Sequence, residues 1–349
     1  MISVGLVGFG YASRTFHAPL ISSTSGMSLD AIVQRHGTEA SEAYPSAETF
    51  RSLEEMLANS KIELAVIATS NPTHAPLADA CLQAGCHVVI DKPFTVTSED
   101  ARELIATAVE TRRVLSVFQN RRWDGDFLTL RKLIADDRLG SVVRFESAFD
   151  RFRPVVDSNA WRQRDEPGSG ILFDLGPHLI DQALVAFGSP DFLSASIRTE
   201  RKDAVVDDAF DVALDYASGQ HVTLHASMLA CETRPRFSVH GTRGSWIKYQ
   251  LDPQEAALKG GERPPGAKWG QEADTAYGVL TTCDGSSAMH ETIATLPGDY
   301  IAYYENIRDA ILGVAPLIVT PQQALHVMEL IELSLRSQKE QRSLAVRLS

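Results

Sequence analysis

The chain has few cysteines, no long apolar run and no basic tract, and each of these shortages excludes a class of protein. Only four of the 349 residues are cysteines, and none of them belongs to a CxxC pair. This usage is typical of a reduced, cytoplasmic protein without a structural zinc site. No apolar stretch approaches the ~20 residues of a membrane span, and the chain starts with strand-like sequence instead of a signal segment. We therefore expect a cytoplasmic protein with no membrane partner.

The charge balance of the chain is acidic. Asp and Glu number 45 against 33 for Lys and Arg, which gives a formal net charge of −12. Because neutralising phosphates requires a basic face, we expect no nucleic-acid partner. At 38.1 kDa the chain exceeds the size at which one hydrophobic core keeps growing. We expect two domains, at residues 1–120 and 121–349.

Short apolar runs alternate with helical segments in the first 120 residues. The runs lie at residues 2–8, 28–34, 64–69, 87–90 and 114–118. Strands that are buried on both faces, with a helix between each pair, form a doubly wound parallel sheet. The sequence therefore predicts an α/β fold for the N-terminal domain.

The pattern changes after about residue 120, where a predicted helix at 126–137 leads into longer alternating runs. These runs lie at residues 142–152, 210–217, 221–229 and 236–242. Successive strands joined by tight turns favour an open, largely antiparallel sheet in an α/β domain. We expect residues 252–292, which are rich in Gly, Pro and charge, to be partly irregular, and residues 322–341 to form an amphipathic helix.

The first apolar run leads into "GFGYAS" (8–13) and then into a helical segment. Gly8 allows a tight turn, and Gly10 allows the backbone to approach a pyrophosphate, which the N–H groups at the start of a helix attract. Ser13 stands where a third glycine is usual and is small enough for close helix packing. The motif predicts a dinucleotide site, and an ordinary structural turn is the alternative interpretation.

The end of the second run bears on which dinucleotide is bound. An NAD enzyme usually carries an acid there for the ribose hydroxyls. Asp30 is expected to open the strand and so to lie far from that end, which reads "QRHG" (34–37). Arg35 suits the 2′-phosphate of NADP instead. We therefore predict NADP, with NAD as the open alternative, and with a solvated loop arginine as the competing explanation of Arg35.

Two further segments carry candidates for chemistry. "DKPFTVT" (91–97) follows a buried run, so Lys92 stands at the carboxyl end of a strand, where open parallel sheets bind ligands. In the apolar helix predicted at 168–188, Asp174 and His178 are four residues apart and share one face. A histidine beside a carboxylate suits general acid–base catalysis. A capping aspartate with a core histidine is the structural alternative, and no third ligand at a suitable spacing supports a metal site.

The segments "VGFGYAS", "TSNPTHAPLADACLQAGCHVVIDKPFTVT" and "GSGILFDLGPHLIDQ", in this order, closely resemble the Gfo/Idh/MocA oxidoreductases. With "QNRRWDGDFLTL" and "IAYYENIRDA" (301–310), the chain resembles the NADP-dependent scyllo-inositol dehydrogenase branch of that family. The resemblance implies an N-terminal Rossmann domain and a C-terminal α/β domain whose open sheet commonly forms homodimers or homotetramers. The family's Glu-Lys-Pro motif corresponds to Asp91-Lys92-Pro93, with a shorter acid in this chain.

The resemblance also implies the roles of individual residues. By it, the catalytic residues are Lys92, Asp174 and His178. Together with the motifs above, the expected cofactor-binding residues are Gly8, Gly10, Tyr11, Ala12, Arg35, Thr69, Asn71, His74, Asp91, Lys92 and Asn120. The expected substrate-binding residues are Arg121, Trp161, Asp174 and His178.

The resulting hypothesis is an NAD(P)-dependent dehydrogenase that interconverts a secondary alcohol and a ketone on a cyclic polyol or sugar, with an inositol and NADP favoured. A pyranose dehydrogenase of the same family is the first alternative. A dinucleotide-sensing regulator that has lost the chemistry is an alternative of another class, against which the presence of Lys92, Asp174 and His178 together argues.

Overall fold

The structure is a computed structural model that describes residues 1–157, 161–266, 268–284 and 287–349. The chain divides into two compact units, and each of them contains segments that are far apart in the sequence. The first unit consists of Met1–Asn120, Gln254–Trp269 and Asp299–Met328. The second consists of Arg121–Pro253, Gly270–Gly298 and Glu329–Ser349.

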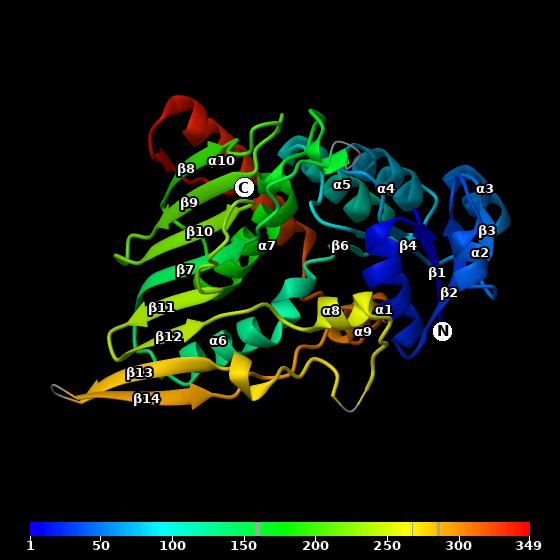
Figure 1. Ribbon diagram of the computed structural model, residues 1–349. Coiled ribbons are helices and arrows are strands. Elements are labelled where there is room, and N and C mark those ends of the chain that lie inside the picture. The colour runs from blue at the N-terminus through cyan, green and yellow to red at the C-terminus, as the bar shows by residue number, and fades with distance from the viewer. Residues whose placement is uncertain (158–160, 267, 285–286) are drawn as a thin grey trace. The chain divides into compact units, whose positions relative to one another are not determined.

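The first unit is built on a parallel sheet. Among the described residues this sheet has six strands, in the order β3-β2-β1-β4-β5-β6 (Figure 1). The strands are β1 (Ile2–Val7), β2 (Met27–Val33), β3 (Glu48–Phe50), β4 (Leu64–Ile67), β5 (His87–Ile90) and β6 (Leu115–Val117). The order reverses between β1 and β4, which is the switch point at which open parallel sheets bind ligands.

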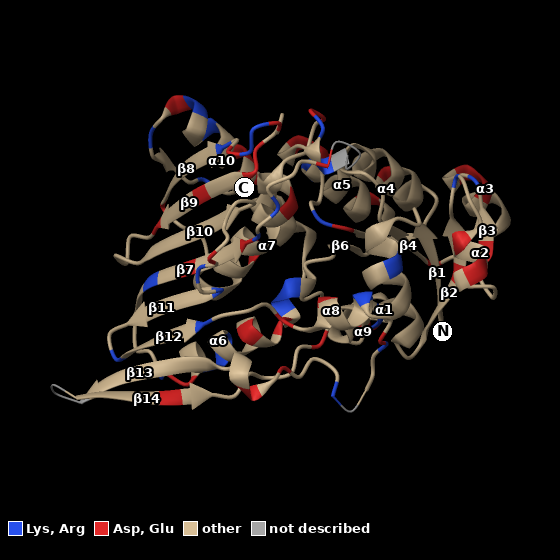
Figure 2. Ribbon diagram, in the orientation of Figure 1, with Lys and Arg blue, Asp and Glu red and all other residues tan. Residues whose placement is uncertain are grey.

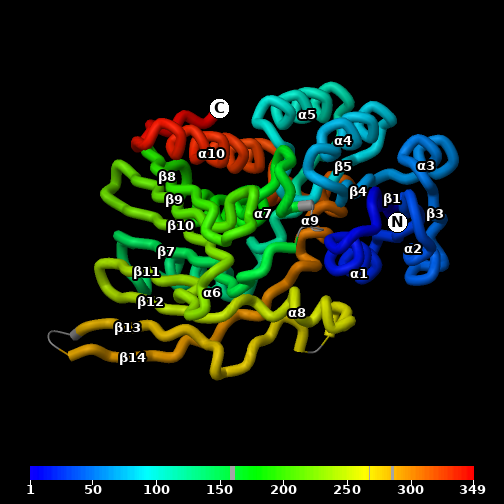
Figure 3. The backbone as a smooth tube through the Cα atoms, turned by 45° about the horizontal axis from the view of Figure 1, so that its top comes forward, coloured from blue at the N-terminus to red at the C-terminus, as the bar shows by residue number. Residues whose placement is uncertain are grey.

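Helices cover both faces of this sheet. They are α1 (Ala18–Ser23), preceded by a helical turn η1 (Ser13–His17), α2 (Glu39–Ala43), α3 (Leu53–Asn59), α4 (His74–Gln83), α5 (Ser98–Thr111), α8 (Gln254–Lys259) and α9 (Ile301–Ile311). Helices α4 and α5 pack together on one face and α1 and α9 on the other (Figure 3). Every residue of β4 is buried, which explains its uninterrupted apolar sequence. The predicted doubly wound parallel sheet is confirmed.

The second unit is built on a mixed sheet. In the part of the chain that the structure describes, it has nine strands in the order β14-β13-β12-β11-β7-β10-β9-β8-β15. These are β7 (Val142–Asp150), β8 (Phe192–Arg198), β9 (Ala209–Asp215), β10 (His221–Ser227), β11 (Phe237–Gly241), β12 (Gly244–Lys248), β13 (Gly278–Asp284), β14 (Ser287–Ile293) and β15 (Leu344–Ala345). The β7–β10 pair is parallel, and the other described pairs of neighbouring strands in this sheet are antiparallel. The predicted open, largely antiparallel sheet is confirmed.

Helices α6 (Gly125–Ala135) and α7 (Ile171–Phe187) pack on one face of this sheet. Phe127 of α6 lies 6.4 Å from Phe237 and Phe187 of α7 lies 5.1 Å from Phe145, measured between ring centroids. Alternate residues of β10, such as Val222 and Leu224, are fully buried on this side. The alternation in the sequence therefore reflects one covered face of the sheet.

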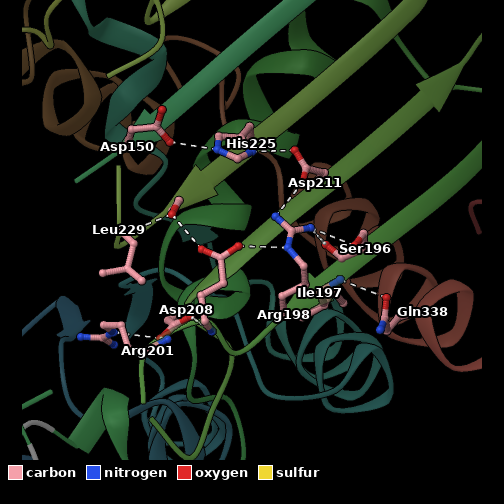
Figure 4. Close-up of polar contacts among 12 residues, drawn as sticks. Asp150, Ser196, Ile197, Arg198, Arg201, Asp208, Asp211, His225, Leu229 and Gln338 are labelled. Carbon is pink, nitrogen blue, oxygen red and sulfur yellow. Dashed lines mark hydrogen bonds and ion pairs between the residues drawn. The ribbon is translucent and has the colours of Figure 1, made fainter. Parts of the chain in front are cut away.

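The opposite face of the sheet carries a row of charges across four neighbouring strands (Figure 4). His225 on β10 lies 3.1 Å from Asp150 on β7 and 2.6 Å from Asp211 on β9, and Arg198 on β8 lies 2.8 Å from Asp211. Burial works to lower the pKa of His225, but the two carboxylates outweigh it and raise that pKa. This face of the sheet is therefore polar where the other is apolar.

Residues 252–292 are more regular than the sequence predicts. The expectation of a partly irregular stretch holds only for part of it, because α8 lies within it and β13 pairs with β14 as a hairpin. Most residues of β14 are exposed, so the hairpin lacks the apolar alternation by which strands are recognised. The amphipathic helix expected at 322–341 is present as α10 (Pro321–Glu340).

Charged side chains are spread over the elements of both units (Figure 2). Acidic side chains gather on α2 and α3, whose first turns carry Glu39, Glu42, Glu54 and Glu55. Carboxylates in a first turn are stabilised by the unpaired N–H groups of the helix start. Within the described residues, no helix combines the length and the apolar character that crossing a membrane requires.

Candidate active site

The glycine turn after β1 lies at the switch point of the parallel sheet. Gly8 has a φ of +92°, and a Cβ at this position would lie 2.7 Å from the carbonyl oxygen of Ala68, which follows β4. Neither the conformation nor the close approach allows a side chain. Thr69 contacts the same glycine from the end of β4. The carboxyl ends of β1 and β4 therefore meet tightly at this point.

Gly10 differs from Gly8, because a Cβ there would have no described heavy atom within 4 Å. The protein's own packing does not require this glycine, whereas a pyrophosphate that approaches the backbone does. Ser13 donates a hydrogen bond to the carbonyl of Gly8 over 2.6 Å and so ties the first turn of the helix to the loop. Ala12 precedes this turn, and the half-exposed Tyr11 contacts Glu255 over 3.2 Å. The loop fits a nicotinamide dinucleotide.

The end of β2 carries no acid. Asp30 lies in the middle of the strand, not at its start, and accepts hydrogen bonds from Ser3 and Ser28. Gln34 binds the start of α2 by accepting from the N–H of Ala40 over 2.8 Å. Arg35 is exposed immediately after it. Of these side chains, Arg35 is the one available to a ligand at this edge.

A tight turn follows β5 and carries Asp91 and Lys92. The N–H of Asp91 donates to the carbonyl of Ile67, so the turn begins at the sheet edge. His74 at the start of α4 is fully buried, and its Nδ1 lies 2.9 Å from the carbonyl oxygen of Pro93. Burial lowers the pKa of His74, so the ring is neutral and Nδ1–H donates to that oxygen. His74 thereby holds the turn that presents Lys92, and its expected cofactor contact stays a prediction.

The other expected cofactor residues of the first unit lie at the same edge. Thr69 shares a hydrogen bond with Thr73 over 2.6 Å, in the turn η2 (Asn71–Thr73) that follows β4. Asn71 and Asn120 are both buried, the first after β4 and the second after β6. Since the carboxyl ends of neighbouring parallel strands lie at one edge, these residues share it with Gly8 and Lys92.

Helix α7 of the second unit starts at an unusual glycine. Gly170 has a φ of +88°, and a Cβ there would lie 2.0 Å from Oδ1 of Asp207. The carboxylate of Asp207 accepts from the N–H of Leu172 over 2.7 Å, and its backbone carbonyl accepts from the N–H of Ile171 over 2.9 Å. Two N–H groups of the first turn are therefore capped by one residue from a distant loop.

Asp174 and His178 follow on α7 one turn apart. Asp174 lies 3.3 Å from the guanidinium of Arg162, and His178 is 5% exposed. Asp181, a further turn along, is buried and bound by the guanidinium of Arg122 over 2.6 and 2.8 Å. Asp181 is thus a buried structural acid, and its role differs from those predicted for Asp174 and His178.

Arg121 belongs to a buried polar layer under α7. It pairs with Asp124 over 3.3 Å, lies 4.9 Å from the ring of Phe149, and accepts a hydrogen bond at its carbonyl from Gln182. Arg236 donates to the other end of the Gln182 amide over 2.6 Å. This layer fixes the buried side of α7. The Trp161 side chain, expected to bind substrate, lies outside the described residues.

Lys92 belongs to the first unit, whereas Asp174, His178 and Arg121 belong to the second. The sequence does not reveal the contacts of His17 with Asp91, of Tyr304 with His17, and of Asp207 with the start of α7. The pattern around these residues is that of ordinary helix and loop positions, so their roles arise from tertiary contacts. Among the described residues, no group of three or more His, Cys, Asp or Glu side chains forms a candidate metal site.

Family models match both halves of the chain. Residues 2–119 match the description "Oxidoreductase family, NAD-binding Rossmann fold", and residues 131–346 match "Oxidoreductase family, C-terminal alpha/beta domain". The chain belongs to the Gfo/Idh/MocA oxidoreductase family. It is therefore an enzyme with an NAD-binding Rossmann domain, and the resemblance inferred from the sequence motifs is confirmed.

Individual relatives of this Gfo/Idh/MocA enzyme agree with that assignment. It is 49% identical to the uncharacterized oxidoreductase YdgJ of Escherichia coli (strain K12), over 99% of both chains. It is 37% identical to scyllo-inositol 2-dehydrogenase (NADP(+)) IolW of Bacillus subtilis (strain 168), over 98% of this chain and 95% of that one. The solved structure of the oxidoreductase YvaA from Bacillus subtilis has a TM-score of 0.95 at 36% identity, covering 99% of this chain and 98% of that chain.

Proposed function

We propose that this enzyme is an NADP-dependent dehydrogenase that interconverts a secondary alcohol and a ketone on a cyclic polyol, most specifically an inositol of the scyllo type. The observation that carries the proposal is the placement of Lys92. A cationic side chain stands on a turn at the carboxyl edge, one strand away from the switch point with its glycine turn. A cation at that place suits an alkoxide that develops beside the cofactor.

In this proposal, three side chains carry the chemistry, and each has its own role. His178 accepts the hydroxyl proton, and Asp174 holds the substrate and the imidazole in register. The Lys92 ammonium stabilises the charge that develops on the same oxygen. The nicotinamide cofactor, when bound, supplies or accepts the hydride. In the reverse direction His178 returns the proton to the oxygen.

The inositol assignment rests on similarity and on chemistry. The relative IolW, named as a scyllo-inositol 2-dehydrogenase (NADP(+)), is 37% identical over almost the whole chain. A polyol ring presents several hydroxyls, and Asp174, His178 and Arg121 of the second unit are the proposed hydrogen-bonding partners. A site that pairs each hydroxyl discriminates strongly against analogues that lack one.

The assignment of NADP rests on the end of β2. That end carries Gln34, Arg35, His36 and Gly37, where an NAD enzyme usually carries an acid. Gln34 is bound to the start of α2, while Arg35 is exposed. A guanidinium matches the geometry of a phosphate, so Arg35 is proposed to bind the 2′-phosphate of NADP.

A substrate panel tests the proposed function. Purified enzyme is offered inositol isomers and pyranoses with NADP or NAD, and reduced nicotinamide is followed by its absorbance. We expect an inositol with NADP to give the highest kcat/KM. A preference for a pyranose would replace the proposed substrate, and tight NADPH binding without turnover of any compound would favour a regulator.

A further inference from the structure

A buried network contacts the Lys92 turn from inside the first unit. The carboxylate of Asp91, which precedes Lys92, lies 3.6 Å from Nε2 of His17. Nδ1 of His17 lies 2.6 Å from the hydroxyl of Tyr304 on α9. His17 and Tyr304 are fully buried, and Asp91 is 8% exposed. Three polar side chains, from η1, from the turn after β5 and from α9, thus lie in one line behind Lys92.

Asp91 remains a carboxylate in this buried place. Burial raises its pKa, but the facing His17, together with the charge of Lys92, outweighs burial and holds the pKa of Asp91 below its usual value. The other titratable side chains in the line are His17 and Tyr304, and Tyr304 lies next to Tyr303 on the same helix. A buried carboxylate without such partners would become neutral instead.

Tyr304 determines how His17 faces Asp91. Burial raises the pKa of Tyr304 well above its usual value, so the phenol keeps its proton. If its O–H donates to Nδ1 of His17, then Nε2 carries the ring proton and directs it toward Asp91. The ring of Phe118, 4.5 Å from the His17 centroid, fixes the plane of the imidazole. In that arrangement each side chain donates toward the next one, from Tyr304 to His17 and from His17 toward Asp91.

We propose that His17, oriented by Tyr304, is a positioning residue that holds the Asp91 carboxylate in place and thereby fixes the Lys92 turn for the reaction. This inference rests on the proposed function, because it assigns a purpose to the Lys92 turn. His17 follows the glycine loop by a few residues, so the same helical turn that begins the cofactor site also supports the lysine. His74 holds the turn from the other side through Pro93.

A stability cycle tests the network without cofactor or substrate. His17→Leu removes the ring nitrogens at similar volume, so the pKa of the buried Asp91 should rise. The folded state of the His17→Leu variant then loses stability as the pH rises through that higher pKa. The loss in urea midpoint caused by His17→Leu should therefore be larger at pH 7.5 than at pH 4.5. In the Asp91→Asn background this loss should change less with pH than in the parent background, and the difference between the two backgrounds measures the coupling of His17 to Asp91.

Activity measurements distinguish a positioning role of His17 from a role in packing alone. His17→Leu should lower kcat by up to roughly 10²-fold, since a small displacement of a reacting group has that effect, while the affinity for NADPH stays within about twofold. His17→Gln places an amide N–H near the Nε2 position and should restore most of kcat. Tyr304→Phe, which preserves volume, should lower kcat less, and Tyr303→Phe is its control, because the Tyr303 hydroxyl contacts Ser116 instead of His17.

The outcomes distinguish this inference from the proposed function. A stability cycle without pH-dependent coupling between His17 and Asp91 overturns the inference, whatever the substrate panel shows. Coupling without any loss of kcat in His17→Leu overturns it as well, because the network would then be structural only. A parent enzyme inactive on every polyol refutes the proposed function by itself, while the stability cycle still decides whether His17 holds Asp91.

Discussion

At the scale of single residues, the proposed chemistry depends on interactions that form only in the transition state, when charge develops on the substrate oxygen. Lys92 and His178 are proposed to act on the same hydroxyl oxygen and its proton. Lys92→Ala and His178→Ala should each lower kcat by at least about 10²-fold, the lower range of a general acid–base contribution. NADPH affinity, measured by nicotinamide fluorescence, should change far less, because neither side chain is needed for the fold of the glycine loop.

The double variant shows whether the two residues form one unit. If Lys92 and His178 serve one proton transfer, their joint removal should cost much less than the product of the single losses. The exposed Lys61→Ala is the matched control and should behave as the parent. Near-parental turnover in either single variant would make Lys92 an ordinary lysine at the end of a strand.

Arg35 is the residue on which cofactor preference depends. A charge-assisted hydrogen bond to a phosphate is worth about 1.5–3 kcal/mol, so Arg35→Ala should weaken NADP roughly 10- to 100-fold and leave NAD almost unchanged. Dissociation constants for both cofactors are the measurement, and the exposed Arg131→Ala on α6 controls for loss of positive charge. An equal loss of affinity for NAD and NADP would show that Arg35 does not bind the 2′-phosphate.

At the scale of elements, α7 depends on a cap that the sequence does not reveal. Burial raises the pKa of Asp207 to about 6, although the N–H groups of Leu172 and Ile171 work to lower it. Because this folded pKa exceeds the usual value, the carboxyl contributes stability that is fully present below about pH 4 and lost as the pH rises through about 6. The start of α7 should therefore be less stable at neutral than at mildly acid pH.

Asp207→Asn tests this cap. An asparagine keeps an oxygen that accepts from the N–H of Leu172 but cannot ionise. We expect the variant to lose this component of the pH dependence and to gain stability relative to the parent by about 2 kcal/mol between pH 4.5 and 7.5, because the interval from pH 4.5 to the folded pKa of about 6 spans some one and a half pKa units. Urea unfolding at both pH values is the measurement, with the exposed Asp203→Asn as control. Parallel curves for Asp207→Asn and the parent would contradict the raised pKa.

The elements that the sequence predicts are those whose burial leaves a pattern. Strands β1, β4 and β5 are buried on both faces and are apolar runs in the sequence. Helix α10 is recognised by apolar residues that recur at helical spacing. Strand β3 escapes prediction because it is short and only its last residue is buried, and β14 because its side chains are mostly exposed. Lys92 and Gly8 could be predicted because they stand next to buried strands. His17 and Asp207 could not, because their partners are 287 and 35 residues away in the chain.

At the scale of the whole molecule, the first unit is completed by segments from the C-terminal part of the chain. Helix α9 packs against α1, and its Tyr303 lies 4.9 Å from the ring of Phe118, measured between centroids. Ser116 on β6 donates to the carbonyl of Val319 over 2.8 Å. Tyr303, Tyr304 and Ile307 of α9 are almost completely buried. The parallel sheet therefore depends on residues 299–328 for one of its faces.

This arrangement predicts that residues 1–120 do not form a stable dinucleotide-binding domain by themselves. Each buried side chain of this size contributes roughly 1.5–3 kcal/mol, so three of them together approach the 5–15 kcal/mol stability of a typical domain. Removing α9 would also expose Phe118 and leave the buried His17 without its Tyr304 partner. The fragment 1–120 should show no cooperative thermal transition and no NADPH binding, and co-expression with the fragment 121–349, which carries α8 and α9, should restore both. Cooperative unfolding and parental NADPH affinity in the isolated fragment would show that α9 is dispensable.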